Sequence, residues 1–175
     1  MTFAAALGLK EKILSGLVCA LILFFLAVSY DASGGELGHP SFYGPTGLLV
    51  TIFTIALGFR PIGYTLGSSA LEVERPFTNW RLPYSEIRAV RAPAEYPTFF
   101  TIGVWRAEGF FGSYGLYWNR PWGLFRVFVT DSKRLVEIIR EDGSRVVVSP
   151  DDPRGFRDAL IARAKLAGAA VAFAT

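Results

Sequence analysis

Histidine and cysteine are almost absent from this chain. The 175 residues contain one of each, His39 and Cys19. Nucleophilic catalysis by a Ser-His or Cys-His pair needs a histidine beside the nucleophile, and a structural zinc site needs about four Cys or His ligands. The sequence therefore predicts a protein that is not an enzyme and has no metal site and no cofactor. Cys19 has no partner for an intramolecular disulfide, and we interpret it as a small packing residue.

Nucleotide-binding motifs and strong net charge are also lacking. The glycines of Gly109–Gly115 have the spacing GxxGxxG, which fits neither the dinucleotide nor the P-loop pattern. The adjacent carboxylates Asp151 and Asp152 are better explained as the start of a helix than as a catalytic pair. The net charge of +3 is far from the basic stripe of a nucleic-acid-binding protein, so we predict no nucleic-acid partner.

Charge is missing altogether from two long apolar runs, Ile13–Tyr30 and Leu37–Phe59. A helix needs roughly 20 mostly apolar residues to cross a bilayer. The connection Asp31–Glu36 is short enough to force two antiparallel helices. The sequence therefore predicts a transmembrane helical hairpin.

The basic residues beside these runs predict the orientation of the hairpin. Lys10 and Lys12 precede the first run and Arg60 follows the second, whereas the connection carries only Asp31 and Glu36. The positive-inside rule then predicts that both termini lie in the cytoplasm. In this orientation the lipid bilayer surrounds the two helices.

Three points about the N-terminal part stay open. Ala27–Ser29 resembles a signal-peptide cleavage site, and both runs could instead be buried core helices of a soluble protein. Residues 1–12 are either a frayed terminus, which we favour, or an interfacial helix that rests Phe3, Leu7 and Leu9 on the membrane.

After Arg60 the pattern changes to that of strands, so we divide the chain into a hairpin with a short cytoplasmic lead, residues 1–60, and a cytoplasmic domain, residues 61–175. Leu71 and Val73 alternate with Glu72 and Glu74, as in a half-buried strand. We expect further strands, with the right residue types between turn residues, at Ile62–Leu66, Asn79–Leu82, Ile87–Val90, Phe99–Trp105, Leu124–Thr130, Leu135–Arg140 and Ser144–Ser149.

The last third carries the clearest signals. Asp142-Gly143 between two β-rich runs predicts a hairpin turn, because such turns need positive φ. Asp152 and Pro153 predict the cap and first position of a helix. Its predicted apolar face has helical spacing and consists of Phe156, Leu160, Ile161 and Ala164. The fold class is therefore α+β, with about seven strands and a C-terminal helix that covers the sheet.

Two groups of residues are candidates for contact with a partner or with lipid. Aromatic residues gather in a glycine-rich segment, which we expect to be a loop or a bulged strand pair, and they either fill the core or dock outside it: Phe110, Phe111, Trp118 and Trp122. Arginines follow the membrane exit and either attract anionic headgroups or pair with cross-strand glutamates: Arg60, Arg75, Arg81, Arg88 and Arg91. Of the aromatic residues, Trp118 and Trp122 flank an expected turn and are the stronger candidates for exposure.

The order of these elements resembles the bacterial PH-like domain family of membrane proteins, over roughly residues 62–164. The resemblance is carried by Ala70–Arg75, by Trp80–Ile87, by the segment from Gly109, and by Leu124–Leu160 with Val148–Pro153 and Phe156. It implies a PH-like, partly open barrel capped by a helix, in the bacterial cytoplasmic membrane, but it implies no ligand. Eukaryotic lipid-binding PH domains place basic residues in the first hairpin loop, and the equivalent turn here, near Leu66–Ala70, has none.

We therefore expect a non-catalytic, membrane-anchored PH-like module that acts as an accessory or scaffold subunit beside other membrane protein subunits. The alternative is a module that binds or senses anionic lipid headgroups at the cytoplasmic leaflet.

Overall fold

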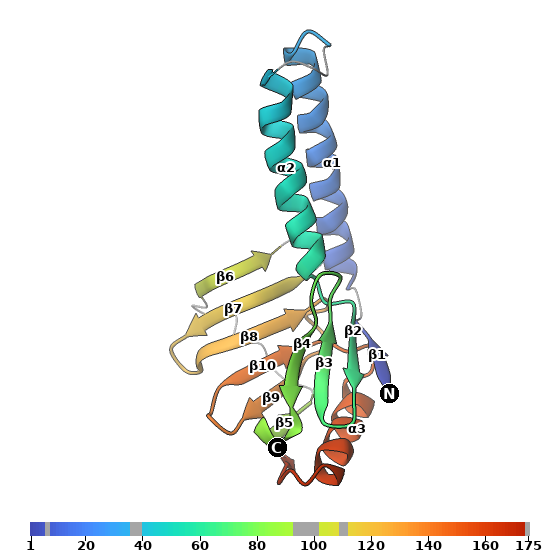
Figure 1. Ribbon diagram of the computed structural model, residues 1–175, viewed down its shortest axis with the longest axis vertical. Helices are drawn as coiled ribbons and strands as arrows, with labels where there is room; N and C mark the ends of the chain where they lie inside the picture. The colour runs from blue at the N-terminus through green and yellow to red at the C-terminus, as the bar shows by residue number, and fades with distance from the viewer. Residues whose placement is uncertain (6–7, 36–39, 93–101, 109–111, 174–175) are drawn as a thin grey trace.

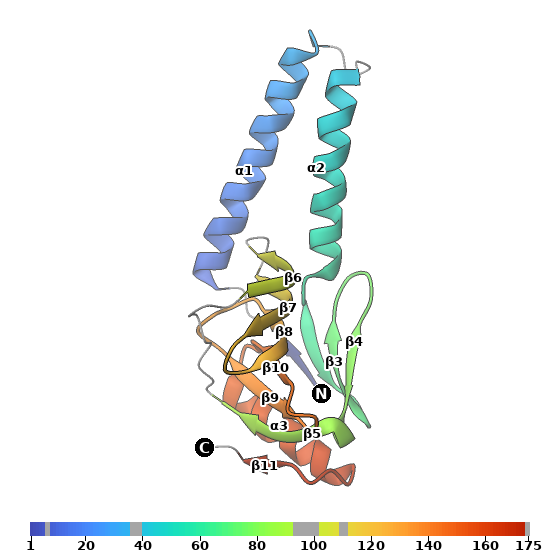
Figure 2. The same cartoon turned by 90° about the vertical axis from the view of Figure 1, so that its left-hand side faces the viewer.

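The computed structural model describes residues 1–5, 8–35, 40–92, 102–108 and 112–173. Two long helices stand side by side at one end of the molecule, and a domain of two β-sheets and one helix lies at the other (Figures 1 and 2). The chain starts inside this domain, leaves it for the helix pair and then returns to it.

The helix pair consists of α1 (Leu9–Ala32) and α2 (Pro40–Phe59). The structure confirms two long apolar helices in this part of the chain. Only 6% of the apolar window in the first helix and 11% of that in the second is buried, so neither is a core helix of the domain. The two helices diverge toward the β-rich domain (Figure 2). The negatively charged connection falls partly outside the described residues, which resume at Pro40.

The first sheet has four antiparallel strands in the order β1-β2-β3-β4. Their bounds are Thr2–Ala4, Gly63–Leu66, Ala70–Glu74 and Trp80–Pro83. The N-terminal lead was expected to be frayed or an interfacial helix, and this expectation is wrong for its first residues. Thr2–Ala4 pair with Gly63–Thr65, and Phe3 is buried against Phe156 with ring centroids 5.2 Å apart.

The second sheet has seven strands in the order β11-β5-β9-β10-β8-β7-β6. In chain order their bounds are Ile87–Arg91 (β5), Ile102–Glu108 (β6), Ser113–Asn119 (β7), Gly123–Val129 (β8), Val136–Arg140 (β9), Arg145–Val148 (β10) and Ala172–Phe173 (β11). The turn at Gly143, with φ of 80°, joins β9 to β10 as predicted. Strand β10 lies between β9 and β8 and runs parallel to β8, an arrangement that no local pattern encodes.

The two sheets do not close into a barrel, which agrees with the partly open barrel that the resemblance implied. Strands β4 and β6 are both edge strands of their own sheets. A short 3₁₀ helix, η1 (Tyr84–Glu86), carries the chain from one sheet to the other. The described residues form eleven strands, against about seven expected. Strands β1 and β11 come from segments too short to show a pattern, and β7 forms in the glycine-rich segment, where it pairs with β6 through a register shift.

Helix α3 (Pro153–Leu166) covers the core opposite the helix pair (Figure 1). The cap predicted for Asp152 is confirmed, since its Oδ1 accepts a hydrogen bond of 3.0 Å from the backbone N–H of Gly155. The apolar face is confirmed as well, and its four predicted members are all buried. They pack with residues of both sheets, including Tyr64, Leu71, Ile138 and Val148.

A buried polar network joins the two sheets. The hydroxyl of Tyr64 on β2 donates to the carbonyl of Phe128 at 2.7 Å and accepts from the backbone N–H of Ser149 at 3.1 Å. The Ser149 hydroxyl in turn accepts from the backbone N–H of Thr130 at 2.7 Å. Since burial removes these polar groups from water, their hydrogen bonds fix how one sheet sits on the other. Burial also raises the pKa of Tyr64 to about 12.

Candidate functional site

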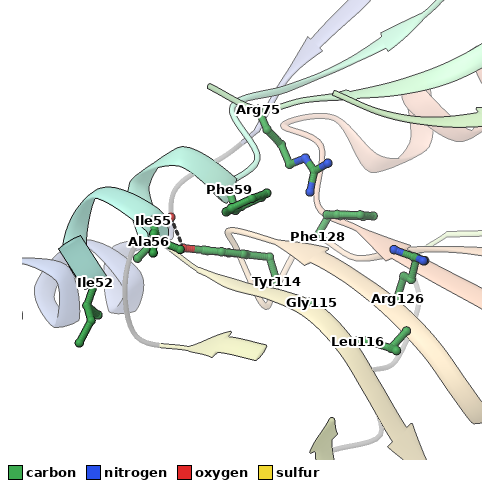
Figure 3. Close-up of a pocket in the computed structure, with 10 residues that line it drawn as sticks. All are labelled: Ile52, Ile55, Ala56, Phe59, Arg75, Tyr114, Gly115, Leu116, Arg126 and Phe128. Carbon is green, nitrogen blue, oxygen red and sulfur yellow. Dashed lines mark hydrogen bonds between the residues drawn. The ribbon is translucent and has the colours of Figure 1, made fainter. Parts of the chain in front are cut away.

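A cavity of about 540 Å³ lies where α2 meets the seven-stranded sheet (Figure 3). One wall comes from the last turns of α2, another from β7 and β8, and the end of β3 closes one side. Its lining residues are Ile52, Ile55, Ala56, Phe59, Arg75, Tyr114, Gly115, Leu116, Arg126 and Phe128. The lining is thus mostly apolar, with two guanidinium groups.

Two contacts fasten α2 to the domain beside this cavity. The hydroxyl of Tyr114 on β7 donates to the backbone carbonyl of Ala56 (Figure 3). The backbone N–H of Phe77, in the β3–β4 turn, donates to the carbonyl of Gly58 at 3.0 Å. Both carbonyls belong to the last turn of the helix, where intrahelical donors run out. The domain supplies the missing donors, so it caps the helix and fixes the cavity wall.

Glycine at position 58 allows the close approach of the β3–β4 turn. A Cβ atom built at Gly58 would lie 2.1 Å from the nearest carbon of the Phe77 ring. Any larger residue would therefore displace the ring. The Phe77 ring also meets Phe59 edge-on at 5.8 Å, so the turn packs on the end of the helix as well as bonding to it.

Arg75 lies at the end of β3 with its guanidinium over two aromatic rings. The guanidinium carbon is 5.6 Å from the centroid of Phe59 and 5.7 Å from that of Phe128. Its Nε donates to the carbonyl of Thr78 at 2.7 Å, which closes the turn and leaves the terminal nitrogens for other partners. Burial, and then the positive charge of Arg126, lower the pKa of Arg75 below its usual value.

Arg126 is the second cation of the cavity and projects from β8. Its guanidinium carbon lies 5.8 Å from the centroid of Trp80. The guanidinium groups of Arg75 and Arg126 both end close to the Phe128 ring in Figure 3. Within the described part of the chain, neither arginine forms an ion pair with a carboxylate. Two like charges thus share an aromatic floor with no described counter-ion.

The cavity lining has few titratable groups. Its titratable groups are two guanidinium groups, which stay charged, and the phenol of Tyr114, whose pKa burial raises to about 12. None of them exchanges a proton readily near neutral pH. Among the residues described, no three His, Cys, Asp or Glu side chains gather as metal ligands.

The arginines predicted from the sequence do not form one patch. Arg75 lines the cavity, Arg81 donates to Glu72 at 2.8 Å, and Arg91 reaches Glu137 at 3.4 Å. Arg88 is exposed on β5, and Arg60 follows the end of α2. Pairing with glutamate, the alternative considered for these residues, therefore describes Arg81 and Arg91, while Arg75 stands apart.

The predicted aromatic contacts also separate. Trp118 lies on β7 with 42% of its surface exposed. Trp122 packs edge-on against Phe125 at 5.2 Å and carries the guanidinium of Arg145 at 4.5 Å from its ring centroid. A turn does separate Trp118 from Trp122, since Asn119 pairs with Gly123. Phe110 and Phe111 lie outside the described residues.

Sequence reasoning missed Arg126 and Tyr114. The signal for Arg126 was its position two residues before Phe128 in a strand, which puts both side chains on the same face. Arg126 itself is exposed, but it shares this face with the buried Phe128, so its charge lies at the edge of the apolar core. Tyr114 carried no such signal, because its partner is a backbone carbonyl 58 residues away.

Comparison with known families decides what kind of domain carries this cavity. A family model described as Bacterial PH domain matches residues 62–164. The chain belongs to this family. The matched part of this PH domain begins just after α2 and ends within α3, so the helix pair and β1 lie outside it. No curated protein and no solved structure matches the chain.

Proposed function

We propose that the helix pair of this PH-domain protein crosses the bacterial cytoplasmic membrane, with the domain and both chain ends in the cytoplasm. The two candidate spans, Lys12–Ala32 and Phe42–Phe59, contain 21 and 18 residues. Pairing of β1 with β2 supports an even number of crossings, because these strands flank the helix pair on either side in the chain. The positive-inside rule supports the orientation.

In this setting the protein acts as a non-catalytic accessory or scaffold subunit of a membrane protein complex. The observation that carries this proposal is a helix pair that is firmly held at its base and almost bare along its length. The backbone N–H of Gly8 donates to Thr130 at 3.1 Å, and α2 is capped by Tyr114 and Phe77. A base held this way presents the helix faces to neighbours in a fixed orientation.

One face of α2 has room for another helix. Gly44 and Gly47 have no atom within 4 Å of the position that a Cβ would occupy. Small residues let transmembrane helices approach closely, and packing at such sites drives their association. PH domains are in general binding modules without catalytic activity, and a subunit of this kind needs no reactive group.

Photo-crosslinking in native membranes tests the accessory role. A benzoylphenylalanine at Gly47 is expected to give a covalent adduct with another membrane chain, and the same group at Arg88, an exposed position on β5, is the control. The protein extracted in mild detergent is expected to migrate as part of a larger complex on a native gel. A lone monomer in both experiments would contradict the proposal.

The second candidate is a module that binds anionic lipid at the cytoplasmic leaflet. The specific observation in its favour is the pair of cavity arginines without a described carboxylate partner. Flotation of the full chain reconstituted with or without anionic lipid does not isolate this property, because the helices hold the protein in either vesicle. The site itself has to be tested.

A further inference from the structure

The cavity between α2 and the seven-stranded sheet has a cationic end and an apolar end. At its domain end Arg75 and Arg126 bring two positive charges close enough that the charge of one lowers the pKa of the other. At its helix end Ile52 and Ile55 are about half exposed and line the cavity along one face of α2. A ligand that satisfies both ends is anionic at one end and apolar at the other.

The cationic end is suited to a phosphate. Guanidinium groups bind phosphate oxygens through pairs of parallel hydrogen bonds, and such charge-assisted bonds are about twice as strong as neutral ones. The Nε of Arg75 is already bonded to Thr78, so its terminal nitrogens remain for the ligand. The rings of Phe59 and Phe128 lie under the guanidinium of Arg75 and partly bury it, which strengthens its attraction for an anion. The guanidinium of Arg126 lies near the ring of Trp80 and is exposed, so a ligand can reach it.

The apolar end identifies the source of the phosphate. Ile52 and Ile55 lie on a helix that we propose to be in the bilayer, one to two turns before its cytoplasmic end at Phe59. An acyl chain beside these residues lies in hydrocarbon, while its phosphate lies at the level of the headgroups. A soluble phosphate ester or an acidic peptide reaches the arginines but gains nothing from this wall. Only a lipid of the cytoplasmic leaflet contacts both ends at once.

We infer that this cavity holds one anionic glycerophospholipid, with its phosphate between Arg75 and Arg126 and an acyl chain along Ile52 and Ile55. This inference rests on the second candidate function and on the proposed insertion of the helix pair. It differs from lipid attraction by the general positive charge of the domain, because it assigns one lipid to one place. The proposed lipid site also lies apart from the first hairpin loop near Leu66–Ala70, which has no basic residue.

Native mass spectrometry of the full chain in mild detergent tests the assignment. The probes are palmitoyl-oleoyl phosphatidylglycerol and palmitoyl-oleoyl phosphatidylcholine, which share their acyl chains. We expect a single bound phosphatidylglycerol at a lipid concentration about tenfold lower than phosphatidylcholine needs, consistent with about 1.4 kcal/mol of headgroup preference. Equal binding of the two lipids would overturn the inference.

Two variants examine the two ends of the site separately. Arg126→Gln removes a charge with no hydrogen bond among the described residues, and Ile55→Trp fills the apolar end without changing charge. Each is expected to reduce phosphatidylglycerol binding at least fivefold. The matched controls are Arg120→Gln, in the β7–β8 turn, and Val50→Trp, an exposed residue on another face of α2. Both controls are expected to bind as the unaltered protein does.

Each remaining outcome decides against part of the inference. If Arg120→Gln weakens binding as much as Arg126→Gln, the attraction is diffuse and there is no defined site. If Ile55→Trp has no effect, or if glycerol 3-phosphate displaces the lipid at equal concentration, the site takes a phosphate group without its chain. These measurements use purified protein without partner subunits, so they succeed or fail independently of the accessory role.

Discussion

Arginine has opposite roles at the two ends of the β-rich domain. On β5, β9 and β10, away from the helix pair, Arg91 and Arg145 both bind Glu137, whose side chain is 2% exposed. At the base of α2, Arg75 and Arg126 approach each other without a described carboxylate. The first group has a carboxylate partner within the fold. The second has none among the described residues, and such local inconsistencies are typical of functional sites.

The largest expected effect comes from the buried carboxylate of Glu137. Glu137→Gln leaves Arg91 and Arg145 without a counter-ion in a half-buried place. We expect the free energy of unfolding to fall by ~3 kcal/mol, the lower end of the range for breaking a buried ion pair, because both arginines stay partly exposed. Thermal unfolding in detergent, followed by circular dichroism, measures it. Glu72→Gln, which unpairs the exposed Arg81, is the control and is expected to cost under ~1 kcal/mol. An equal loss of unfolding free energy in Glu137→Gln and Glu72→Gln would show that the buried carboxylate is no more important than the exposed one.

Alkaline unfolding compares the two buried tyrosines. The pKa of Tyr64, between the sheets, and that of Tyr114, at the base of α2, are each raised to about 12. The unfolded chain loses these protons near pH 10, whereas the folded chain retains them up to about pH 12. Their contribution to stability is therefore complete below pH 10 and is lost as the pH rises from 10 to 12.

Two variants test whether Tyr64 and Tyr114 cause this loss of stability at high pH. Tyr64→Phe and Tyr114→Phe are each expected to reduce the loss of stability between pH 10 and pH 12, measured by urea unfolding at a series of pH values. At neutral pH each costs ~1–2 kcal/mol, because a buried hydrogen-bond partner is left unsatisfied. A pH dependence unchanged in both variants would show that other groups cause it.

Substitution at Gly58 tests the attachment of α2. Gly58→Ala displaces the Phe77 ring, and since that ring is 57% exposed it can move aside. We expect a loss of ~1 kcal/mol, at the lower end of the cost of overpacking. In a Phe77→Ala background the same substitution is expected to cost less, and thermal unfolding of the four proteins gives the coupling energy. Additive effects would mean that the ring does not press on the helix.

The smallest effect is expected at the cavity itself. Without added phospholipid, Arg126→Gln relieves the repulsion on Arg75 and is expected to change the free energy of unfolding by less than ~0.5 kcal/mol. Arg145→Gln, which takes a partner from Glu137, is expected to be clearly less stable. Thermal unfolding of both variants in the same detergent makes the comparison. A loss above ~1 kcal/mol for Arg126→Gln would assign this arginine to the fold instead of to a ligand.

Local sequence signals predicted the local structure well. The alternation at Leu71 and Val73 gave a strand, Asp142-Gly143 gave a hairpin, and Asp152 with Pro153 gave a capped helix. Each of these features depends on neighbours within a few residues, where backbone preferences and side-chain periodicity act directly.

Long-range features had no such signal. Strand β1 is three residues long and pairs with β2, from which the helix pair separates it in the chain. No local pattern therefore predicts this pairing. The parallel contact of β10 with β8, and the open edges of the two sheets, depend on how the sheets pack. The candidate site depends on the same packing, since it joins a helix to strands from two sheets. Of its residues only Arg75 was proposed from the sequence, on account of charge alone.

The first strand has a consequence for how the chain assembles. Thr2 is synthesised 63 residues before Thr65, to which its side chain is hydrogen-bonded. With the helix pair inserted in the membrane as proposed, both apolar helices enter the bilayer before Thr2–Ala4 can pair with β2. The pairing of β1 with β2 therefore forms only after both helices have been synthesised. A bulky fusion at Met1, whose carbonyl accepts the N–H of Leu66 at 2.8 Å, would crowd that pairing, whereas a fusion beyond residue 173 would leave it free.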